Sequence, residues 1–573
     1  MPPKRRRRSA SAAGTEREPS SVKAARRPRG PSTPQDVFAW PREVLGCIMD
    51  ATDVEGRVAA ARLDQSLCKT EIHFTSDYSG IDGPQEVLRL LVEAYNRRAG
   101  GTDAHASLRV LRTCDKGSKQ HSILCAMSKQ LHAGTTCVFY DIEDRLDERF
   151  IKGLDALEPQ QHMSADEQRL CRAEQGELLL AAVDDRTLFT GCANSRCSVH
   201  GSQCPTLPQR LPSANRKRLR LHISGTTCVG WSGEGAQARW IHKSERAHAV
   251  WLAERKHAAM HKLEDVFIQE CTPRYPWELK LQKPLASTHV VRRVAVDSKS
   301  LGYPCKRLRS WVIGVSKASM AWVGPDDADV QRAFDYAFCR QLCATGDVFL
   351  NATQTEIAED HRRRAEKQKN FFPGGMRVVE EISSGTQVLE SCMPIGMHNI
   401  FLEYQQVRDD MGFGGKPFFA DLDHHAYTQG PKPGSEIPVE LTHNSFVAFH
   451  FNRFLHPFET LSSHGFMVHP PVCEEFGVSP MRDILVQCLD KKYFAKQLGQ
   501  LSGNGMDLPS AAAVICFMLS NTIRQSTIPE VRFGRKGATQ FFEAGMGVFE
   551  DGGGDEHASS SGLGVSQTEV SVE

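Results

Sequence analysis

Two spacings of apolar residues alternate through the first half of the chain. Short apolar runs, typical of buried strands, are separated by stretches in which apolar residues recur with a helical period. The expected strands cover residues 72–74, 108–111, 137–140, 219–223, 266–269, 291–296 and 311–315, and the expected helices cover residues 36–65, 85–95, 121–131 and 169–182. Because strands that alternate with helices form parallel sheets with crossover helices, the pattern predicts an α/β fold with a doubly wound, mostly parallel sheet.

The pattern changes at several points, and these changes predict the domain organisation. Residues 146–215 interrupt the alternation, and residues 316–445 are less regular, with a helix near 329–342. Strand and helix then return and end in an apolar helix at 511–519. The expected parts are a disordered basic tail (1–35), a helical lead-in (36–65), a core (66–315) with an insertion (146–215), a smaller inserted domain (316–445), a return segment of the core (446–525) and a flexible tail (526–573).

Charge is unevenly distributed along the 573 residues. The net charge is +1, but residues 1–35 carry ten Lys/Arg against Glu16 and Glu18, so that segment is +8 and the remainder −7. The run from Lys4 to Arg8 indicates a nuclear-import signal or a nucleic-acid-binding arm, and a solvated disordered tail is compatible with both. We therefore expect a nuclear protein.

The apolar runs and the cysteines set two further expectations. No apolar run approaches the roughly 18–20 residues of a membrane span, so no membrane partner is expected. The N-terminus lacks the apolar region of a secretion signal. We therefore expect the 18 cysteines to serve as thiols, metal ligands or a catalytic group, and not as a disulfide framework.

Polar residues follow the first three expected strands and outline a nucleoside pocket. The first strand ends in a loop of small residues, from Tyr78 to Gly83, whose backbone N–H groups can approach a ligand at a helix N-terminus. Asp115 follows the second strand, where an acid can bind ribose hydroxyls, and Asp141 with Ile142 follows the third, suited to an adenine amino group. Taken singly, the loop is also compatible with an ordinary turn and each carboxylate with a helix cap.

A cysteine-rich segment lies within residues 146–215. Cys192, Cys197, His200 and Cys204 offer three thiols and one imidazole, a set that can satisfy a tetrahedral zinc ion. Their spacing is not a standard one, and unrelated free cysteines are the alternative. Zinc is therefore a candidate structural metal.

Further chemistry-bearing residues follow the later strands in a fixed order. Cys228 follows the strand at 219–223, where an α/β enzyme can place a nucleophile, and Glu270 ends the strand at 266–269. Arg307 and Arg309 precede the strand at 311–315. Two later blocks, Arg453 to Phe466 and Gly503 to Met506, complete a succession that resembles the cytosine-C5 methyltransferase family over roughly residues 70–520.

The resemblance implies a sheet of the S-adenosylmethionine-dependent methyltransferase type, with residues 316–445 as the target-recognition region. It implies DNA cytosine as substrate, S-adenosylmethionine as cofactor and a DNA partner, with RNA as the alternative. It places Tyr78, Ser79, Gly80 and Gly83 on the cofactor loop, Asp115 (or Thr113) at the ribose, Asp141 and Ile142 at the adenine, Cys228 as nucleophile, Glu270 as the acid on the cytosine ring, Arg307 and Arg309 as orienting arginines, and Asn504 beside the cofactor.

Five positions depart from the family pattern. Thr227 stands where the family usually has Pro, Cys271 and Thr272 stand in place of Asn-Val, and Cys305 replaces a Gln. Asp82 also replaces a loop glycine and adds charge near the cofactor. Misplacement of a thiol can cost about a hundredfold in rate, so a catalytically degenerate, nucleic-acid-binding descendant is the alternative of a different class.

Overall fold

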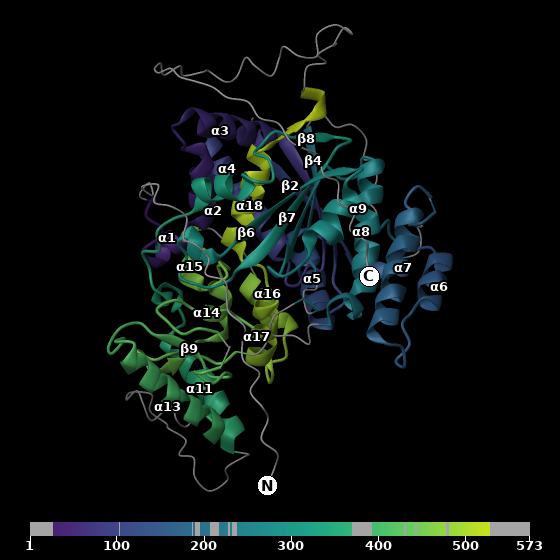
Figure 1. The fold of residues 1–573 in the computed structure, drawn as a ribbon. Coiled ribbons are helices and arrows are strands. Elements are labelled where there is room, and N and C mark those ends of the chain that lie inside the picture. The colour runs from purple at the N-terminus through teal and green to yellow at the C-terminus, as the bar shows by residue number, and fades with distance from the viewer. Residues whose placement is uncertain are drawn as a thin grey trace, which may run out of the picture. The chain divides into compact units, whose positions relative to one another are not determined.

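Seven strands form the central sheet in the computed structural model, which describes residues 27–527 apart from 102–103, 186, 190–194, 207–216, 227–229, 232–237, 370–391, 429–430, 442–443 and 477–480. Their order is β3-β2-β1-β4-β5-β7-β6, and β7 alone runs antiparallel to its neighbours β5 and β6 (Figure 1). The strands are β1 (Thr70–Asp77), β2 (Ser107–Cys114), β3 (Cys137–Phe139), β4 (Lys217–Gly225), β5 (Val266–Cys271), β6 (His289–Val296) and β7 (Arg309–Ser316). The expected doubly wound, mostly parallel sheet is therefore confirmed.

Apolar residues on successive positions of a strand face two different cores. Along β5, Val266 and Ile268 pack into one cluster, and Phe267 between them packs into the other. A side-chain period of two produces this division. A Cβ at Gly314 of β7 would lie 1.9 Å from the Phe267 ring, so glycine is required where that ring crosses the neighbouring strand.

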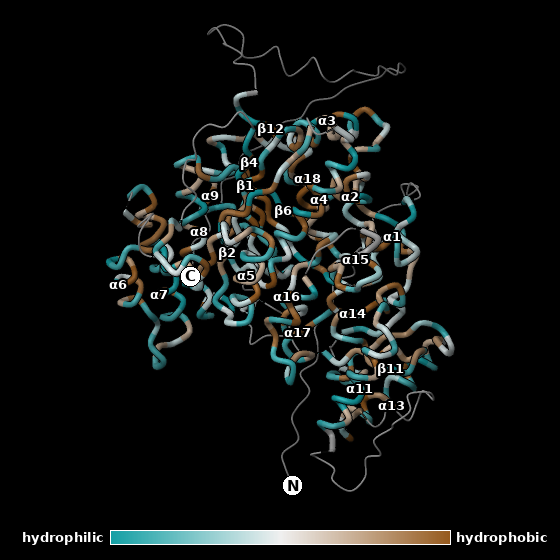
Figure 2. The backbone as a smooth tube through the Cα atoms, turned by 180° about the vertical axis from the view of Figure 1, so that it is seen from behind, coloured by the Kyte–Doolittle hydropathy of each residue, from teal (hydrophilic) through white to brown (hydrophobic). Residues whose placement is uncertain are grey.

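Helices cover both faces of the sheet. One face carries α2 (Trp40–Met49), α3 (Val54–Leu67), α4 (Gly83–Ala99), α5 (Ser118–Leu131), α10 (Val330–Phe338) and α18 (Leu508–Ser520), and the other carries α7 (Ala165–Ala181), α8 (Ser244–Met260) and α9 (Lys283–Leu285). All residues of α18 are buried, and most of the helix has the brown colour of hydrophobic residues in Figure 2. The expected lead-in at 36–65 is therefore part of the cover of the core, because α2 and α3 pack against α18.

The segment expected as an insertion at 146–215 includes the connection that the topology requires. After β3 at the edge, the chain must pass β2 and β1 to reach β4. The helices α6 (Glu148–Ala156) and α7 make this passage, and α7 packs against α8. Sequence pattern alone did not distinguish this long crossover from an insertion.

A smaller sheet lies outside the core. Its strands β9 (Phe419–Asp421), β10 (Phe446–Ala448) and β11 (Arg453–Phe454) are antiparallel and pack with α11 (Gln354–Lys369) and α13 (Ile395–Asp410). The Phe401 and Phe449 rings stack with centroids 4.8 Å apart in its core. This sheet crosses the boundary expected at 445, because β10 and β11 pair with β9 and not with the central strands.

The remaining elements surround these two sheets. They are α1 (Pro34–Phe38), β8 (Met320–Trp322), α14 (Pro457–Ser462), α15 (Pro470–Phe476), α16 (Met481–Cys488), α17 (Phe494–Gly503) and β12 (Thr522–Arg524), which pairs with β8. The helix expected near 329–342 is the shorter α10. Residues 28–30, expected in the basic tail, are instead held by Gly30 N–H donating to the Gln341 carbonyl at 2.8 Å and Gln341 N–H donating to the Pro28 carbonyl at 2.8 Å. None of the described helices has the length and apolarity to cross a membrane.

Candidate active site

The loop between β1 and α4 makes an unusually tight turn at the carboxyl edge of the sheet. Tyr78, Gly80 and Asp82 all have positive φ, at 52°, 59° and 60°. Only glycine adopts this region without steric cost, so Tyr78 and Asp82 are strained by about 1–2 kcal/mol each. Strained backbone of this kind concentrates at ligand-binding sites. The loop therefore has the local structure expected of the cofactor-binding turn.

Asp115 joins this loop to the end of β2. Its carboxylate accepts hydrogen bonds from Gly80 N–H and Gly117 N–H, both at 2.8 Å. Burial raises the pKa of the Asp115 carboxyl to about 6, against the opposing effect of these two donors. A carboxylate has about four acceptor positions, so two remain for the ribose hydroxyls that the resemblance implies.

Asp141 continues the series at the end of β3. Its Oδ1 accepts from Glu143 N–H at 3.1 Å, as an ordinary cap, and its Oδ2 lies 2.5 Å from Nζ of the exposed Lys116. Ile142 is 5% exposed and packs in a hydrophobic core. In this structure Asp141 therefore acts as a cap, as one of the two interpretations of the sequence expected. If the exposed Lys116 were displaced, Oδ2 would be free to accept from a ligand.

Several buried polar atoms along this edge have no hydrogen-bond partner among the described residues. They are Ser76 Oγ, Tyr78 OH, Asp82 Oδ1, Gln85 Nε2 and Thr113 Oγ1. Burial raises the pKa of Asp82 to about 8, with Glu86 adding to the effect against a backbone donor at Gln85. Unpartnered buried groups are uncommon in native proteins and call for an explanation such as a bound ligand. These atoms fit a polar cofactor at the edge that the loop and Asp115 define.

The ends of β4 and β5 meet beside the same loop. Gly225 at the end of β4 pairs with Glu270 of β5. A Cβ at Gly225 would lie 3.5 Å from the Tyr78 carbonyl oxygen and 3.7 Å from Glu270 Oε2. Cys228, the expected nucleophile, and Thr227 lie outside the described residues. The strand that leads to Cys228 therefore ends between the Tyr78–Gly83 loop and the candidate acid Glu270.

The two arginines have different surroundings. Arg309 Nε lies 2.8 Å from Glu270 Oε1, and both side chains are partly exposed. Arg307 is buried and donates to the carbonyls of Gly503 and Gly505. Burial, with repulsion from Arg309, lowers the pKa of Arg307 to about 10. Arg309 therefore orients the candidate acid, whereas Arg307 holds the late turn around the exposed Asn504 against the core.

The chain at and just after the Gly503–Met506 block packs against Gly83, at the end of the Tyr78–Gly83 loop. A Cβ at Gly83 would contact Met506, Leu508 and Phe466 at 3.4–3.5 Å. The Arg453 to Phe466 block is structural in this state, because Arg453 pairs with buried Glu459 at 2.7 Å and Glu459 accepts from Ala352 N–H at 2.9 Å. Departures from the family pattern at Cys271 and Cys305 are buried core positions and leave the Glu270–Arg309 pair intact.

Sequence reasoning missed a buried ionic network beneath the loop. Asp77, the last residue of β1, pairs with Arg145 at 3.0 Å and lies 3.6 Å from Arg112, and both arginines pair with Glu254 of α8. Burial acts to raise the pKa of Asp77, but Arg145 and Arg112 outweigh it and hold that pKa below its usual range. In the sequence, the available signal for this network was Asp77, a charged residue at the end of the buried strand β1.

The neighbour of this network is a neutral histidine. Trp251 Nε1–H donates to His222 Nε2 at 3.1 Å, and Nδ1 lies 2.9 Å from Thr75 Oγ1. Burial and the charge of Arg255 hold the pKa of His222 well below its usual value, so the ring is neutral. Because Nε2 accepts from Trp251, the proton lies on Nδ1. Gln269, beside Glu270, was also missed and donates to Thr226 Oγ1 at 2.6 Å.

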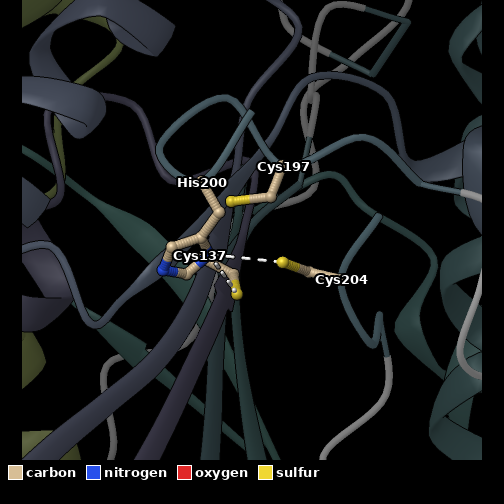
Figure 3. A group of neighbouring side chains, drawn as sticks. All are labelled: Cys137, Cys197, His200 and Cys204. Carbon is tan, nitrogen blue, oxygen red and sulfur yellow. Dashed lines mark hydrogen bonds between the residues drawn. The ribbon is translucent and has the colours of Figure 1, made fainter. Parts of the chain in front are cut away.

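The predicted metal ligands come together only in part. Cys197, His200 and Cys204 gather with Cys137 of β3, and the four ligand atoms lie within 4.8 Å of one another (Figure 3). Cys192, the fourth ligand expected from the sequence, lies outside the described residues. Cys137 was missed because it is distant in sequence and was assigned only to a strand.

No protein-family model and no curated protein matches this chain. Among solved structures, the chain is similar to the Dnmt2 methyltransferase of S. pombe, at 11% identity and a TM-score of 0.36, over 78% of this chain and 98% of that one. It is similar to a putative DNA modification methyltransferase of an E. coli prophage, at 11% identity and a TM-score of 0.34, over 78% and 99%. It is also similar to the Entamoeba histolytica methyltransferase EhMeth, at 9% identity and a TM-score of 0.33, over 78% and 98%. At such low scores and identities these likenesses carry no residue role over to this chain.

Proposed function

We propose that the protein transfers a methyl group from S-adenosylmethionine to C5 of cytosine in nucleic acid, with DNA as the substrate. The observation that carries this proposal is the meeting of three strand ends: the strained Tyr78–Gly83 loop, Gly225 before Cys228, and Glu270 with Arg309. In open α/β sheets, ligands bind outside the carboxyl ends of the strands. Cys228 follows Gly225 by three residues in the sequence, and the proposal assigns its thiol to this edge.

The proposed roles follow from the chemistry of the ring. S-adenosylmethionine, when bound, supplies an electrophilic methyl group. Cytosine C5 is a poor nucleophile, and addition of the Cys228 thiolate at C6 makes C5 a carbanion equivalent that can accept that methyl group. Glu270, held by Arg309 at 2.8 Å, would hold a proton at N3 so that negative charge does not accumulate on the ring. Loss of the C5 proton and of Cys228 then restores the aromatic ring.

Substrate choice is the finer part of the proposal. The base must leave its stack to reach a thiol at the strand edge, so base flipping is expected for duplex DNA. The partly exposed Arg309 and the basic N-terminal segment would contact phosphates.

The first experiment measures transfer of labelled methyl from S-adenosylmethionine to duplex DNA and to tRNA. The variant is Cys228→Ala, and the matched control is Cys171→Ala, a thiol on α7 that is remote in sequence from the site. We expect label on DNA with the wild type and the control, and loss of at least about a hundredfold with Cys228→Ala. Label on tRNA alone would replace DNA by RNA as substrate. Cofactor binding without transfer to either would reject the activity in favour of a nucleic-acid-binding role.

A second measurement tests the covalent step itself. Fluorine in place of hydrogen at cytosine C5 blocks the final proton loss, so the Cys228 adduct would persist. We expect a mass-spectrometric adduct on the peptide that contains Cys228. A methylated product with no trapped adduct would contradict the role of Cys228 as nucleophile.

A further inference from the structure

We propose that Cys137, Cys197, His200 and Cys204 bind one structural zinc ion. The three thiols and the imidazole come from two segments about 60 residues apart in sequence, the edge strand β3 and the loop at 195–206. Their side chains point toward one centre (Figure 3). The inference goes beyond the proposed activity and does not depend on it.

The distances between ligand atoms fit a tetrahedral ion. Cys137 Sγ and Cys204 Sγ lie 3.5 and 3.2 Å from His200 Nδ1. Ligands at zinc distances of about 2.3 Å for sulfur and 2.0 Å for nitrogen would be separated by roughly 3.5–3.8 Å in a tetrahedron. Small side-chain movements would therefore complete the coordination.

The histidine is oriented by a partner outside the cluster. His200 Nε2–H donates to the Gly134 carbonyl at 2.9 Å, which leaves Nδ1 with its lone pair toward the thiols. Metal-binding histidines almost always make such a bond through the second ring nitrogen. This contact is independent of the spacing of the sulfurs and points to the same centre.

The loop is folded around this centre and attached to β3. Val138 N–H donates to Cys197 Sγ at 3.4 Å, and Ser198 N–H donates to the Val138 carbonyl at 2.9 Å. Gly201, at φ 65°, makes the turn that brings Cys204 back. Cys197 is fully buried and Cys204 is 8% exposed, whereas Cys137 is half-buried and His200 is exposed. The four protein ligands together would fill the four tetrahedral positions of the ion. A closed four-ligand set is that of a structural zinc and not of a catalytic one.

The site would stabilise the part of the sheet that carries the cofactor pocket. β3 is a three-residue edge strand, and Asp141 and Ile142 follow it after one residue. Ser195 Oγ–H donates to the Asp144 carbonyl at 2.7 Å, so the loop also contacts the turn after Asp141. We infer that zinc fastens the 195–206 loop to the end of β3.

The test measures zinc in the full-length protein, purified without a metal-affinity tag, by elemental mass spectrometry. We expect one zinc per chain in the wild type and in the Cys171→Ser control, and loss of most of it in Cys137→Ser and Cys204→Ser. The Cys192→Ser variant separates the two ligand sets. Loss of zinc in Cys192→Ser with retention in Cys137→Ser would overturn the assignment.

A spectroscopic measurement on the wild type avoids variants that fail to fold. X-ray absorption at the zinc edge should give three sulfur ligands near 2.3 Å and one nitrogen near 2.0 Å, values typical of Cys₃His sites. Folded wild-type protein without zinc, or with an oxygen-rich shell, would overturn the proposal. Neither measurement uses methyl transfer, so failure of the zinc site and failure of the proposed activity are distinguishable.

Discussion

Asp82 combines three unfavourable features in one residue of the Tyr78–Gly83 loop. It is 1% exposed, it has a left-handed backbone, and its Oδ1 has no hydrogen-bond partner among the described residues. Burial raises its pKa from 3.8 to about 8. The folded protein therefore holds Asp82 protonated at neutral pH, and the acid added to the loop is not a charge there.

This raised pKa predicts how Asp82→Asn changes stability with pH. A raised folded pKa favours the protonated form, so the stability associated with Asp82 is complete below pH 3.8 and declines until about pH 8. Asn tolerates the left-handed backbone and does not ionise. The free energy of unfolding of Asp82→Asn should therefore gain on that of the wild type by at most about 1.4 kcal/mol per pH unit in this window.

Urea unfolding at pH 5 and pH 8 measures this difference. The control is Asp166→Asn, an exposed acid in the first turn of α7, for which the two curves should stay nearly parallel. Equal differences at both pH values for Asp82→Asn would contradict a buried, protonated Asp82.

At the scale of elements, contacts between consecutive strand ends assemble the candidate pocket. Gly80 of the first loop bonds to Asp115 after β2, and Lys116 pairs with Asp141 after β3. Beneath them, Arg145 joins Asp77 of β1 to Glu254 of α8. We therefore expect the geometry of the candidate pocket to depend on the buried charges beneath it.

Replacing Arg145 by Met should destabilise the fold and weaken the cofactor site. The change removes one of the two arginines that Asp77 and Glu254 share and leaves Arg112 as the other. Loss of one partner costs about 3–5 kcal/mol in comparable buried pairs. Arg149→Met is the control, because its pair with Asp185 at 3.0 Å is more than half exposed on the arginine side and should contribute less than about 1 kcal/mol.

Denaturant unfolding and S-adenosylmethionine titration measure the two effects. If Arg145→Met unfolds at the same denaturant concentration as Arg149→Met, the network does not contribute to stability. If Arg145→Met is destabilised but binds the cofactor with unchanged affinity, the network does not position the loop.

At the scale of the whole molecule, the basic N-terminal segment and the acidic remainder carry opposite charge. Residues 1–26 hold eight Lys/Arg against Glu16 and Glu18, whereas the chain as a whole is +1. Residues 28–30 bond to Gln341, so a truncation should remove only residues 1–26. We propose that this segment binds nucleic-acid phosphates and directs the protein to the nucleus.

Deletion of residues 1–26 should weaken nucleic-acid binding most at low salt. For every phosphate that the segment neutralises, its deletion should reduce the slope of log affinity against log salt by about 0.9 for duplex DNA. Fluorescence anisotropy with a labelled duplex over a series of KCl concentrations measures this slope. A full-length control with Gln at Lys4 to Arg8 should flatten it partly, and an unchanged slope in the deletion would reject the segment as a phosphate-binding element.

Local pattern determined the seven strands of the central sheet, part of the helices and the order of the candidate residues. The apolar runs at 266–269 and 311–315 mark β5 and β7 because buried strands need apolar side chains on both faces. The same reasoning placed Asp115, Asp141 and Glu270 at strand ends, since a strand end is read from where the apolar run stops.

Only the tertiary structure decided which distant groups become partners. Cys137 joins Cys197, His200 and Cys204 because β3 lies beside the 195–206 loop, a proximity that sequence spacing does not encode. Arg307 bonds to Gly503 and Gly505, nearly 200 residues away, and Asp77, Arg145 and Glu254 share a buried network for the same reason. Periodicity records which face of an element is buried, whereas the pairing of buried charges and thiols depends on how the elements pack.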